Sequence, residues 1–138
     1  MFKKISRRSF PDPQTASLSV VEFSEIPFLV RRIYWINDFR PNVTRGNHAH
    51  KSLNQLFMVT NGNLVLELYR GEQVTSISLN SKSDHILIPP GTWRVIKNPS
   101  SNAVVTVLAD TPYLEADYIR DFTEYLEWFT ENIAKDES

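Results

Sequence analysis

The sequence predicts an all-β sandwich or barrel of antiparallel strands followed by one C-terminal helix. Short runs rich in Val, Ile, Leu and aromatic residues recur over residues 1–110, and turn-forming residues separate them. After residue 110 the apolar residues recur at helical spacing instead. The charge changes at the same place, from a net +5 over residues 1–110 to −6 over residues 111–138, within a formal total of −1.

Length and composition limit the kind of protein this can be. A chain of 138 residues is typical of one domain, and Leu, Ile, Val and Phe supply 41 residues for its core. The absence of cysteine excludes disulfides, thiolate zinc sites and a cysteine nucleophile. The small net charge argues against a nucleic-acid partner, and no apolar run has the roughly 18 residues of a membrane span. No apolar run follows the basic N-terminal residues either, so we expect a cytoplasmic protein with a single domain over residues 1–138.

Nine runs in the first part of the chain have the length and composition of strands. They cover residues 18–23, 28–36, 45–50, 55–61, 63–69, 74–79, 86–88, 93–97 and 103–109. The pair Asn61-Gly62 separates two of these runs and predicts a tight hairpin, because both residues tolerate a positive φ. We expect the barrel to span about residues 18–110.

The last part of the chain has the pattern of an amphipathic helix. One helical face would carry Tyr118, Phe122, Tyr125, Leu126, Phe129 and Ile133. Acidic residues occupy the other positions, and Asp110-Thr111-Pro112 is a suitable entry. We expect a helix over about residues 113–134 that packs on the barrel or on a partner subunit and takes no part in the chemistry.

The segment Arg45-Gly46-Asn47-His48-Ala49-His50 forms the first of two motifs that carry chemistry. In a strand, His48 and His50 point to the same face because side chains alternate. Gln55 follows after four residues and Gly62 after six more. Two imidazoles on one inward face suit either a metal site or general acid–base catalysis.

The second motif runs over residues 86–98. A buried strand ends in the turn Pro89-Pro90-Gly91, and a new strand carries Arg94 two residues later and ends near Asn98. An inward-facing Arg94 needs an anionic or polar partner. A substrate phosphate, a keto oxygen and an acid such as Glu67 are the candidates.

The joint spacing of the two motifs resembles that of the cupin superfamily over about residues 30–110. The resemblance implies a cupin, that is, a jelly-roll antiparallel β-barrel. Metal-binding cupins have Glu and a third His where this chain has Gln55 and Arg94. Gln is a weak, neutral ligand and Arg is a permanent cation, so we expect no bound metal. An alternative function is that of a metal-dependent oxygenase, and a bound metal would support it.

Within the cupins, the chain is similar to the nucleotide-sugar 3,4-ketoisomerases, which act on dTDP-4-keto-6-deoxyglucose. The matching segments are residues 27–36, 45–51, 88–93, 107–109 and 113–121. Two of them are specific to this family, Arg45-Gly46-Asn47-His48-Ala49-His50-Lys51 and Asp117-Tyr118-Ile119-Arg120-Asp121. The similarity extends from about Leu18 to Leu126. It implies a homodimer without metal or organic cofactor that acts on a dTDP-linked sugar, in deoxysugar synthesis for surface polysaccharides such as O-antigen and lipopolysaccharide.

The resemblance also implies site residues and their roles. A base removes the C3 proton of the 4-keto sugar, an enediol forms, and the proton returns at C4. The family's favoured base maps to His50, with His48 assisting and Tyr34 as the candidate acid. The substrate-binding candidates are Arg45, Arg94, Arg32, Lys51, Gln55 and Trp35.

Three positions depart from the family's pattern. Thr15 stands where the family has a functional Arg, Trp35 where a functional Tyr is expected, and Arg94 where the family has His. An indole cannot give a proton to an enediolate. The alternative function is therefore a non-catalytic nucleotide-sugar-binding cupin that has lost part of the family's site.

Overall fold

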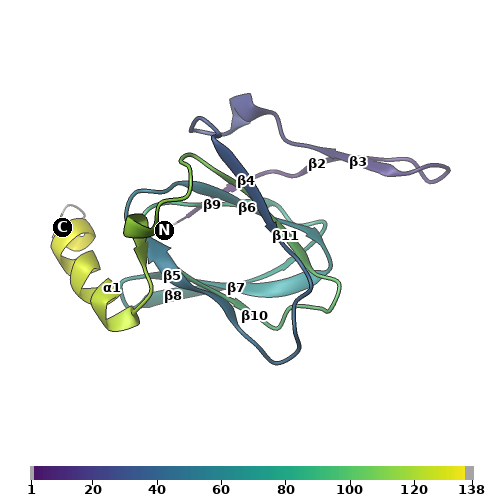
Figure 1. Cartoon of the computed structure of the whole chain (residues 1–138). Coiled ribbons are helices and arrows are strands. Elements are labelled where there is room, and N and C mark those ends of the chain that lie inside the picture. The colour runs from purple at the N-terminus through teal and green to yellow at the C-terminus, as the bar shows by residue number, and fades with distance from the viewer. Residues whose placement is uncertain (1, 136–138) are drawn as a thin grey trace.

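The computed structural model describes residues 2–135 and consists mainly of two antiparallel β-sheets that face each other (Figure 1). The first sheet has the strand order β1 (Lys3–Ile5), β9 (His85–Ile88), β6 (Gln55–Asn61), β11 (Val104–Ala109) and β4 (Arg32–Ile36). The second sheet has the order β12 (Tyr118–Ile119), β5 (Arg45–His50), β10 (Trp93–Lys97), β7 (Asn63–Arg70) and β8 (Gln73–Asn80). No strand pair within residues 2–135 joins the two sheets. The predicted all-β jelly roll is confirmed, as a sandwich rather than a closed barrel.

Most predicted strands are present with small changes at their ends. The hairpin at Asn61-Gly62 joins β6 to β7, and Gly62 has a φ of +70°, which favours glycine. The strand predicted over residues 28–36 is shorter, because β4 begins only at Arg32. A 3-10 turn at Phe23–Glu25 and bends around Pro27 occupy the residues before it.

The first two N-terminal strands are the part of the fold that the sequence did not predict, whereas the third overlaps the strand predicted over residues 18–23. Strand β1 pairs with β9, so the sandwich begins well before residue 18. Strands β2 (Arg8–Pro11) and β3 (Ser17–Val20) pair with each other, and neither joins another strand within residues 2–135. They project from the sandwich as a two-stranded arm, residues 8–20 (Figure 1). Polar and basic residues dominate these strands, which hides the alternation that identifies a half-buried strand.

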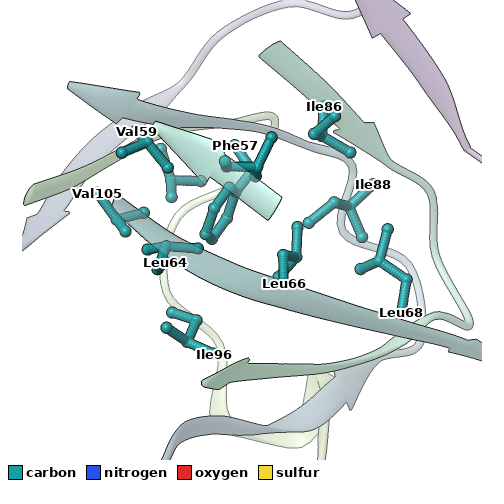
Figure 2. Packing of buried hydrophobic residues seen from close by; sticks show 11 residues of the cluster. Phe57, Val59, Leu64, Leu66, Leu68, Ile86, Ile88, Ile96 and Val105 are labelled. Carbon is teal, nitrogen blue, oxygen red and sulfur yellow. The ribbon is translucent and has the colours of Figure 1, made fainter. Parts of the chain in front are cut away.

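The core lies between the two sheets and is almost wholly aliphatic (Figure 2). The first sheet contributes Phe57, Val59, Ile86, Ile88, Val105 and Val107. The second contributes Leu64, Leu66, Leu68, Leu79 and Ile96. Burying such side chains contributes about 1.5–3 kcal/mol each. This apolar core supports the polar site that lies between the same two sheets.

Both outer faces of the sandwich are also partly covered. On the second sheet, Tyr125 and Phe129 from the C-terminal helix pack against Trp93 and Val95 of β10. On the first sheet, Ile26 and neighbouring residues cover an apolar patch of β6 and β11. Strand β10 is therefore buried on both faces, with Trp93 toward the helix and the intervening Arg94 toward the sandwich interior.

The C-terminal helix is shorter than predicted and begins later. Helix α1 (Phe122–Phe129) starts after Asp121, whose side chain accepts a hydrogen bond from the Glu124 N–H at 2.9 Å. A π-helical turn at Thr130–Ala134 extends it. The predicted start near residue 113 is wrong, because residues 115–117 form a 3-10 turn and residues 118–119 form β12. No helix within residues 2–135 is long and apolar enough to cross a membrane.

Candidate active site

Strands β5 and β10 lie side by side and carry most of the two predicted motifs. Arg94 on β10 is the register partner of His48 on β5, and Ile96 is the partner of Arg45, so β5 holds one extra residue between the two pairs. Gly46 lies in this bulge with a φ of +83°. A bulge bends its strand and redirects the side chains that follow. The bulge therefore sets the direction in which the strand enters the histidine segment.

A cavity of about 390 Å³ opens between the edge strand β4 of one sheet and strands β5 and β12 of the other. His48, Tyr34 and three arginines line it, together with Trp35, Ile36, Gly46, Asn47 and Tyr118. The three arginines are Arg32, Arg45 and Arg120. No acidic residue of the described chain lines this cavity. Its charge therefore suits an anionic ligand.

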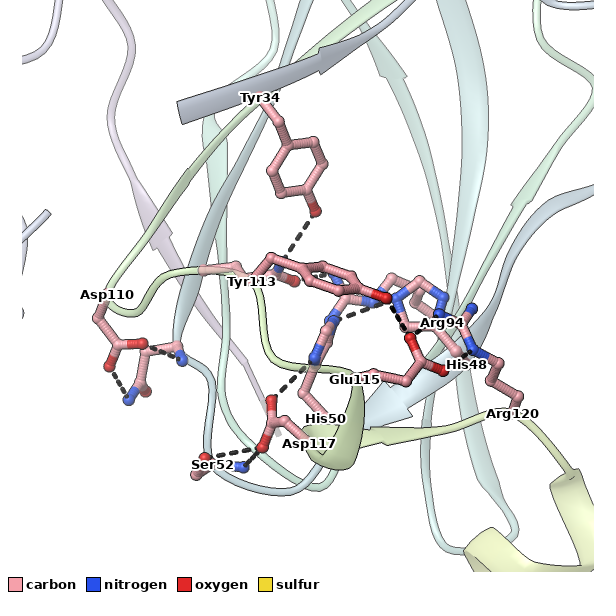
Figure 3. Close-up of polar contacts among 12 residues, drawn as sticks. Tyr34, His48, His50, Ser52, Arg94, Asp110, Tyr113, Glu115, Asp117 and Arg120 are labelled. Carbon is pink, nitrogen blue, oxygen red and sulfur yellow. Dashed lines mark hydrogen bonds and ion pairs between the residues drawn. The ribbon is translucent and has the colours of Figure 1, made fainter. Parts of the chain in front are cut away.

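Two histidines and an aspartate form a hydrogen-bonded series, which we call the histidine network: His48, His50 and Asp117 (Figure 3). His48 Nε2 lies 3.2 Å from His50 Nε2, and His50 Nδ1 lies 3.0 Å from Asp117 Oδ2. The Ser52 N–H and hydroxyl donate to Asp117 Oδ1 at 2.8 and 2.7 Å. His48 is half-buried at the cavity wall, whereas His50 is 2% exposed and lies behind it.

The hydrogen-bond partners determine which ring nitrogens carry hydrogen. An ionised carboxylate only accepts, so His50 Nδ1 must donate to Asp117. In a neutral His50 the Nε2 atom is then an acceptor, and His48 Nε2 must donate to it. This leaves the Nδ1 lone pair of a neutral His48 without a proton. The network therefore provides one basic nitrogen on the residue that lines the cavity.

The electrostatics of the site keep both histidines neutral. Burial, followed by the positive charge of Arg94, lowers the pKa of His48 to about 2 and that of His50 to about 4. Contact with Asp117 raises the pKa of His50 but does not reverse this shift. Burial raises the pKa of Asp117, yet the hydrogen bonds from Ser52 and His50 outweigh it, so its pKa lies below the ordinary value. Near neutral pH the site thus pairs neutral imidazoles with an ionised carboxylate.

A second hydrogen-bonded series, which we call the arginine network, consists of Arg94, Gln55 and Tyr34. Arg94 is 3% exposed and donates through Nη1 to Gln55 Oε1. Gln55 is completely buried, and its Nε2 donates to the Tyr34 hydroxyl at 2.8 Å. Tyr34 is the member of this network that lines the cavity. The acid considered as a partner for Arg94, Glu67, is instead bound to Lys97 at 2.9 Å, so that candidate was wrong.

Tyr118 packs against both histidines and holds their rings in place. Its ring centroid lies 5.0 Å from that of His48 and 4.3 Å from that of His50. The Arg120 guanidinium carbon lies over the Tyr118 ring, 4.2 Å from its centroid, and the guanidinium forms two 3.0 Å hydrogen bonds to Glu115. Tyr113 also donates to Glu115. The segment that follows the sandwich therefore closes one wall of the cavity.

The other residues predicted from the sequence are placed as follows. Arg32 and Arg45 line the cavity, and the Arg32 guanidinium lies 5.4 Å from the Tyr34 ring centroid. Trp35 is 64% exposed at the cavity rim. Lys51 is exposed and is not among the lining residues; its backbone N–H donates to the Asp117 carbonyl at 2.9 Å. Of the substrate-binding residues predicted from the sequence, Arg32, Arg45 and Trp35 line the cavity, whereas Arg94, Gln55 and Lys51 do not.

Thr15, the first departure from the family pattern, lies far from these residues in sequence and in space. It belongs to the turn that joins β2 to β3, where its N–H donates to the Asp12 carbonyl at 3.2 Å. That turn is the tip of the projecting arm (Figure 1). Thr15 therefore takes no part in this chain's own cavity.

The side chains at the cupin metal-ligand positions determine whether a metal ion can bind here. The positions of the cupin metal ligands hold His48, His50, Gln55 and Arg94, of which Arg94 is a buried cation bonded to Gln55. No cluster of three or more His, Cys, Asp or Glu residues in the described chain could hold a metal ion. A cation at this position would face the Arg94 charge directly. These residues do not fit a metal centre.

The sequence analysis missed the contribution of the C-terminal segment to the site. Asp117, Tyr118 and Arg120 all contact site residues, although residues 113–134 were expected to form a helix without a chemical role. The prediction was wrong because β12 pairs Tyr118 with His50 across the sheet. The signal was available in the segment Asp117–Asp121, which is one of the two segments that carry the family resemblance.

The fold and the site together define a cupin-type protein in which a neutral histidine and a tyrosine hydroxyl lie at a cavity lined by arginines. Comparison with known proteins gives the family. Residues 2–130 match the profile of the family described as "FdtA: WxcM-like, C-terminal", and the chain belongs to this family. The resemblance seen in the sequence motifs is thereby confirmed.

Three relatives of known activity or structure illustrate the similarity. The TDP-4-oxo-6-deoxy-alpha-D-glucose-3,4-oxoisomerase of Aneurinibacillus thermoaerophilus is 31% identical over 135 residues, which is 97% of either chain. A 3,4-ketoisomerase from Helicobacter canadensis has 36% identity and a TM-score of 0.87, over 94% of this chain and 97% of that one. The sugar 3,4-ketoisomerase QdtA from Thermoanaerobacterium thermosaccharolyticum, solved in complex with TDP, has 30% identity and a TM-score of 0.89, over 96% of each chain.

Proposed function

We propose that this chain is a nucleotide-sugar 3,4-ketoisomerase that acts on a dTDP-4-keto-6-deoxyhexose. The named activities of its relatives support the reaction, and they favour it over a binding protein without catalysis. The observation that carries the proposal is the pairing of His48 and Tyr34 on one cavity. One presents a basic nitrogen and the other a hydroxyl group, which are the two functions that a keto shift requires.

The basic wall of the cavity supports a nucleotide diphosphate as the anchoring group. Arg32, Arg45 and Arg120 lie around the opening, and guanidinium groups bind phosphate oxygens in a bidentate manner. Trp35 at the rim offers an exposed indole face on which a thymine ring can stack. In this arrangement the phosphates hold the sugar against His48 and Tyr34 at the inner end of the cavity.

We assign the base to His48 rather than to His50, which the sequence favoured. His48 lines the cavity, whereas His50 is buried behind it and bonded on both ring nitrogens. A general base must reach the proton that it removes. His50 and Asp117 then act through His48, because they orient its ring and stabilise the imidazolium that forms when His48 takes a proton.

The reaction moves one proton from C3 to C4. His48 removes the C3 proton, the C–H electrons form a C3–C4 double bond, and the carbonyl electrons move onto O4 to give an enediolate. Tyr34 stabilises the charge on that oxygen by hydrogen bonding. The hydroxyl proton passes from O3 to O4, and the His48 imidazolium returns its proton to C4. The products are a 3-keto sugar and the original neutral His48.

We further propose that the protein is a cytoplasmic homodimer. Its arm exposes Phe10 and Leu18, and an isolated two-stranded hairpin has little stability of its own in water. A second subunit that covers the arm would bury both side chains and would bring Thr15 toward another part of the dimer. The lack of cysteine suits the reducing cytoplasm, where nucleotide sugars are processed. Sedimentation equilibrium tests the dimer, and a monomer at micromolar concentration would contradict it.

The proposed activity is tested by NMR with TDP-4-keto-6-deoxyglucose in D₂O. We expect loss of the C3 proton signal by exchange with solvent, followed by signals of a 3-keto product. Binding of the nucleotide sugar without any exchange would instead support the non-catalytic alternative. Activity that depends on added metal and is lost with a chelator would support the oxygenase class of cupin.

A further inference from the structure

The position of Arg94 raises a question that the proposed reaction does not answer. Arg94 is 3% exposed, forms no ion pair within residues 2–135, and its Nε has no hydrogen-bond partner there. Its side chain does not line the cavity. A buried charge without a counter-ion is costly, so its retention needs a reason. Its hydrogen bond to Gln55 provides one.

Arg94 determines the orientation of the Gln55 amide. A guanidinium has only donors, so the group that faces it must be the amide oxygen. The amide nitrogen then faces Tyr34, at 2.8 Å from its hydroxyl oxygen. Gln55 is completely buried. Rotating its amide group by 180° would place the amide N–H groups against the guanidinium. The amide orientation is therefore fixed by charge.

The orientation of Gln55 in turn determines what Tyr34 can do. Because Nε2 of Gln55 donates, the Tyr34 oxygen accepts, and its own O–H cannot point back at Gln55. No acceptor for the Tyr34 hydrogen is found within residues 2–135, and Tyr34 lines the cavity. The hydroxyl hydrogen is thus left for a group inside the cavity.

We infer that Arg94 and Gln55 are positioning residues that act in sequence to make Tyr34 a hydrogen-bond donor toward a sugar oxygen. The inference rests on the proposed function for the identity of that oxygen, and it changes the role of Arg94. The sequence predicted that Arg94 binds substrate directly, whereas here Arg94 acts on substrate only through two intervening side chains. Gln55, which the sequence also predicted to bind substrate, instead orients Tyr34.

The test replaces the amide by a carboxylate of the same shape, Gln55→Glu. A carboxylate accepts at both oxygens, so Tyr34 must donate to it and loses its hydrogen bond to the sugar. We expect kcat to fall about 10²-fold or more, as for loss of one oxyanion donor, and KM to change little. Tyr34→Phe should show the same loss, and the double variant Gln55→Glu/Tyr34→Phe should be no worse than Tyr34→Phe alone. Gln73→Glu on the exposed part of β8 is the matched control and should retain full activity.

Stability separates this role from a purely structural one. Gln55→Glu gives the buried Arg94 a counter-ion, so its thermal unfolding midpoint should be no lower than that of the unmodified protein while its kcat falls. Wild-type kcat in a folded Gln55→Glu variant would overturn the inference. So would a double variant whose loss equals the product of the two single losses.

A second measurement holds whether or not the chain proves to be an isomerase. In the unmodified protein we expect a nuclear Overhauser effect between the Gln55 amide hydrogens and the Tyr34 ring, because Nε2 faces Tyr34. The same amide signals should move in Tyr34→Phe. An amide whose hydrogens contact Arg94 instead would overturn the inference. Absence of exchange activity in the unmodified protein, with the Gln55 contacts as expected, would count against the proposed function alone.

Discussion

The two polar networks on either side of the cavity have opposite charge at their buried ends. The histidine network starts from an anion, Asp117, and the arginine network starts from a cation, Arg94. In each, a neutral side chain lies between the buried charge and the residue that lines the cavity. His48 consequently presents a lone pair to the ligand, whereas Tyr34 presents a hydrogen.

The sign of a buried charge therefore determines the hydrogen-bonding role of a group two side chains away. Asp117 makes His50 donate to it, which makes His48 donate to His50 and keeps His48 Nδ1 free. Arg94 makes Gln55 accept from it, which makes Gln55 donate to Tyr34. A keto shift needs one acceptor and one donor near the same two carbons, and the two networks supply one each.

The largest effect is expected from removing the base itself. His48→Asn should lower kcat by about 10³-fold, within the range for loss of a general base, and should abolish C3 exchange in the NMR assay. Binding of TDP should persist, because the arginines of the cavity are unchanged. A His48→Asn protein that exchanges C3 at the normal rate would show that another residue is the base.

A nearly equal loss is expected from Asp117→Asn, which reverses the polarity of the histidine network. Because the Ser52 N–H and hydroxyl both donate, they hold the oxygen of the new amide. The N–H₂ group of that amide then faces His50 and donates to its Nδ1. His50 Nε2 then carries the hydrogen, and His48 must be protonated at Nδ1, where it cannot accept. We expect a kcat about 10²- to 10³-fold lower with an intact fold.

Asp110→Asn is the matched control for that variant. Asp110 accepts hydrogen bonds from the Asn54 N–H and side-chain amide at 3.0 and 2.9 Å and forms no hydrogen bond with His48 or His50. This variant should keep normal kcat. Equal losses in Asp110→Asn and Asp117→Asn would indicate a general structural defect and contradict the polarity argument.

A smaller effect is expected on the pH profile of Arg94→Met. The charge of Arg94 is the second cause, after burial, of the low pKa of His48 and His50. Its removal raises the pKa of His48 toward the ordinary 6.5. Because the base works only when neutral, the acidic limb of kcat/KM should move to higher pH. An unshifted limb would show that Arg94 does not act on the histidines electrostatically.

The smallest effect concerns stability in acid. His50 has an ordinary pKa of 6.5 when unfolded and a pKa of about 4 in the folded protein. Between these values only the unfolded state binds the proton, so stability should fall as pH decreases from about 6.5, by up to about 1.4 kcal/mol per pH unit for each such histidine. Above pH 6.5 this contribution should be constant. Urea unfolding at a series of pH values checks this, and His50→Asn should show a shallower decrease.

Much of the sandwich could be predicted from the sequence because its strands are apolar and regularly spaced. The hairpin at Asn61-Gly62 followed from turn chemistry, and the inward position of Arg94 followed from its place in the second cupin motif. Strands β1 and β2 could not be predicted in this way. They are short and polar, and the pairing of β1 depends on the distant residues of β9.

The site could be predicted only in part, for a related reason. His48, Tyr34 and Arg45 fall within recognisable motifs, but their hydrogen-bond partners do not. Asp117 lies 67 residues from His50 in the sequence, and the apolar spacing around it fits a helix as well as a strand and a turn. The choice between the two histidines likewise depended on which one the cavity exposes, which strand alternation cannot decide because both face the interior.

The most direct test of the two-network account is the protonation state of His48, measured by ¹⁵N NMR of the histidine rings near pH 7. We expect a neutral His48 ring that carries its hydrogen on Nε2, with Nδ1 free, and a neutral His50 ring with its hydrogen on Nδ1. A His48 ring with hydrogen on Nδ1, or a charged ring with hydrogen on both nitrogens, would contradict it.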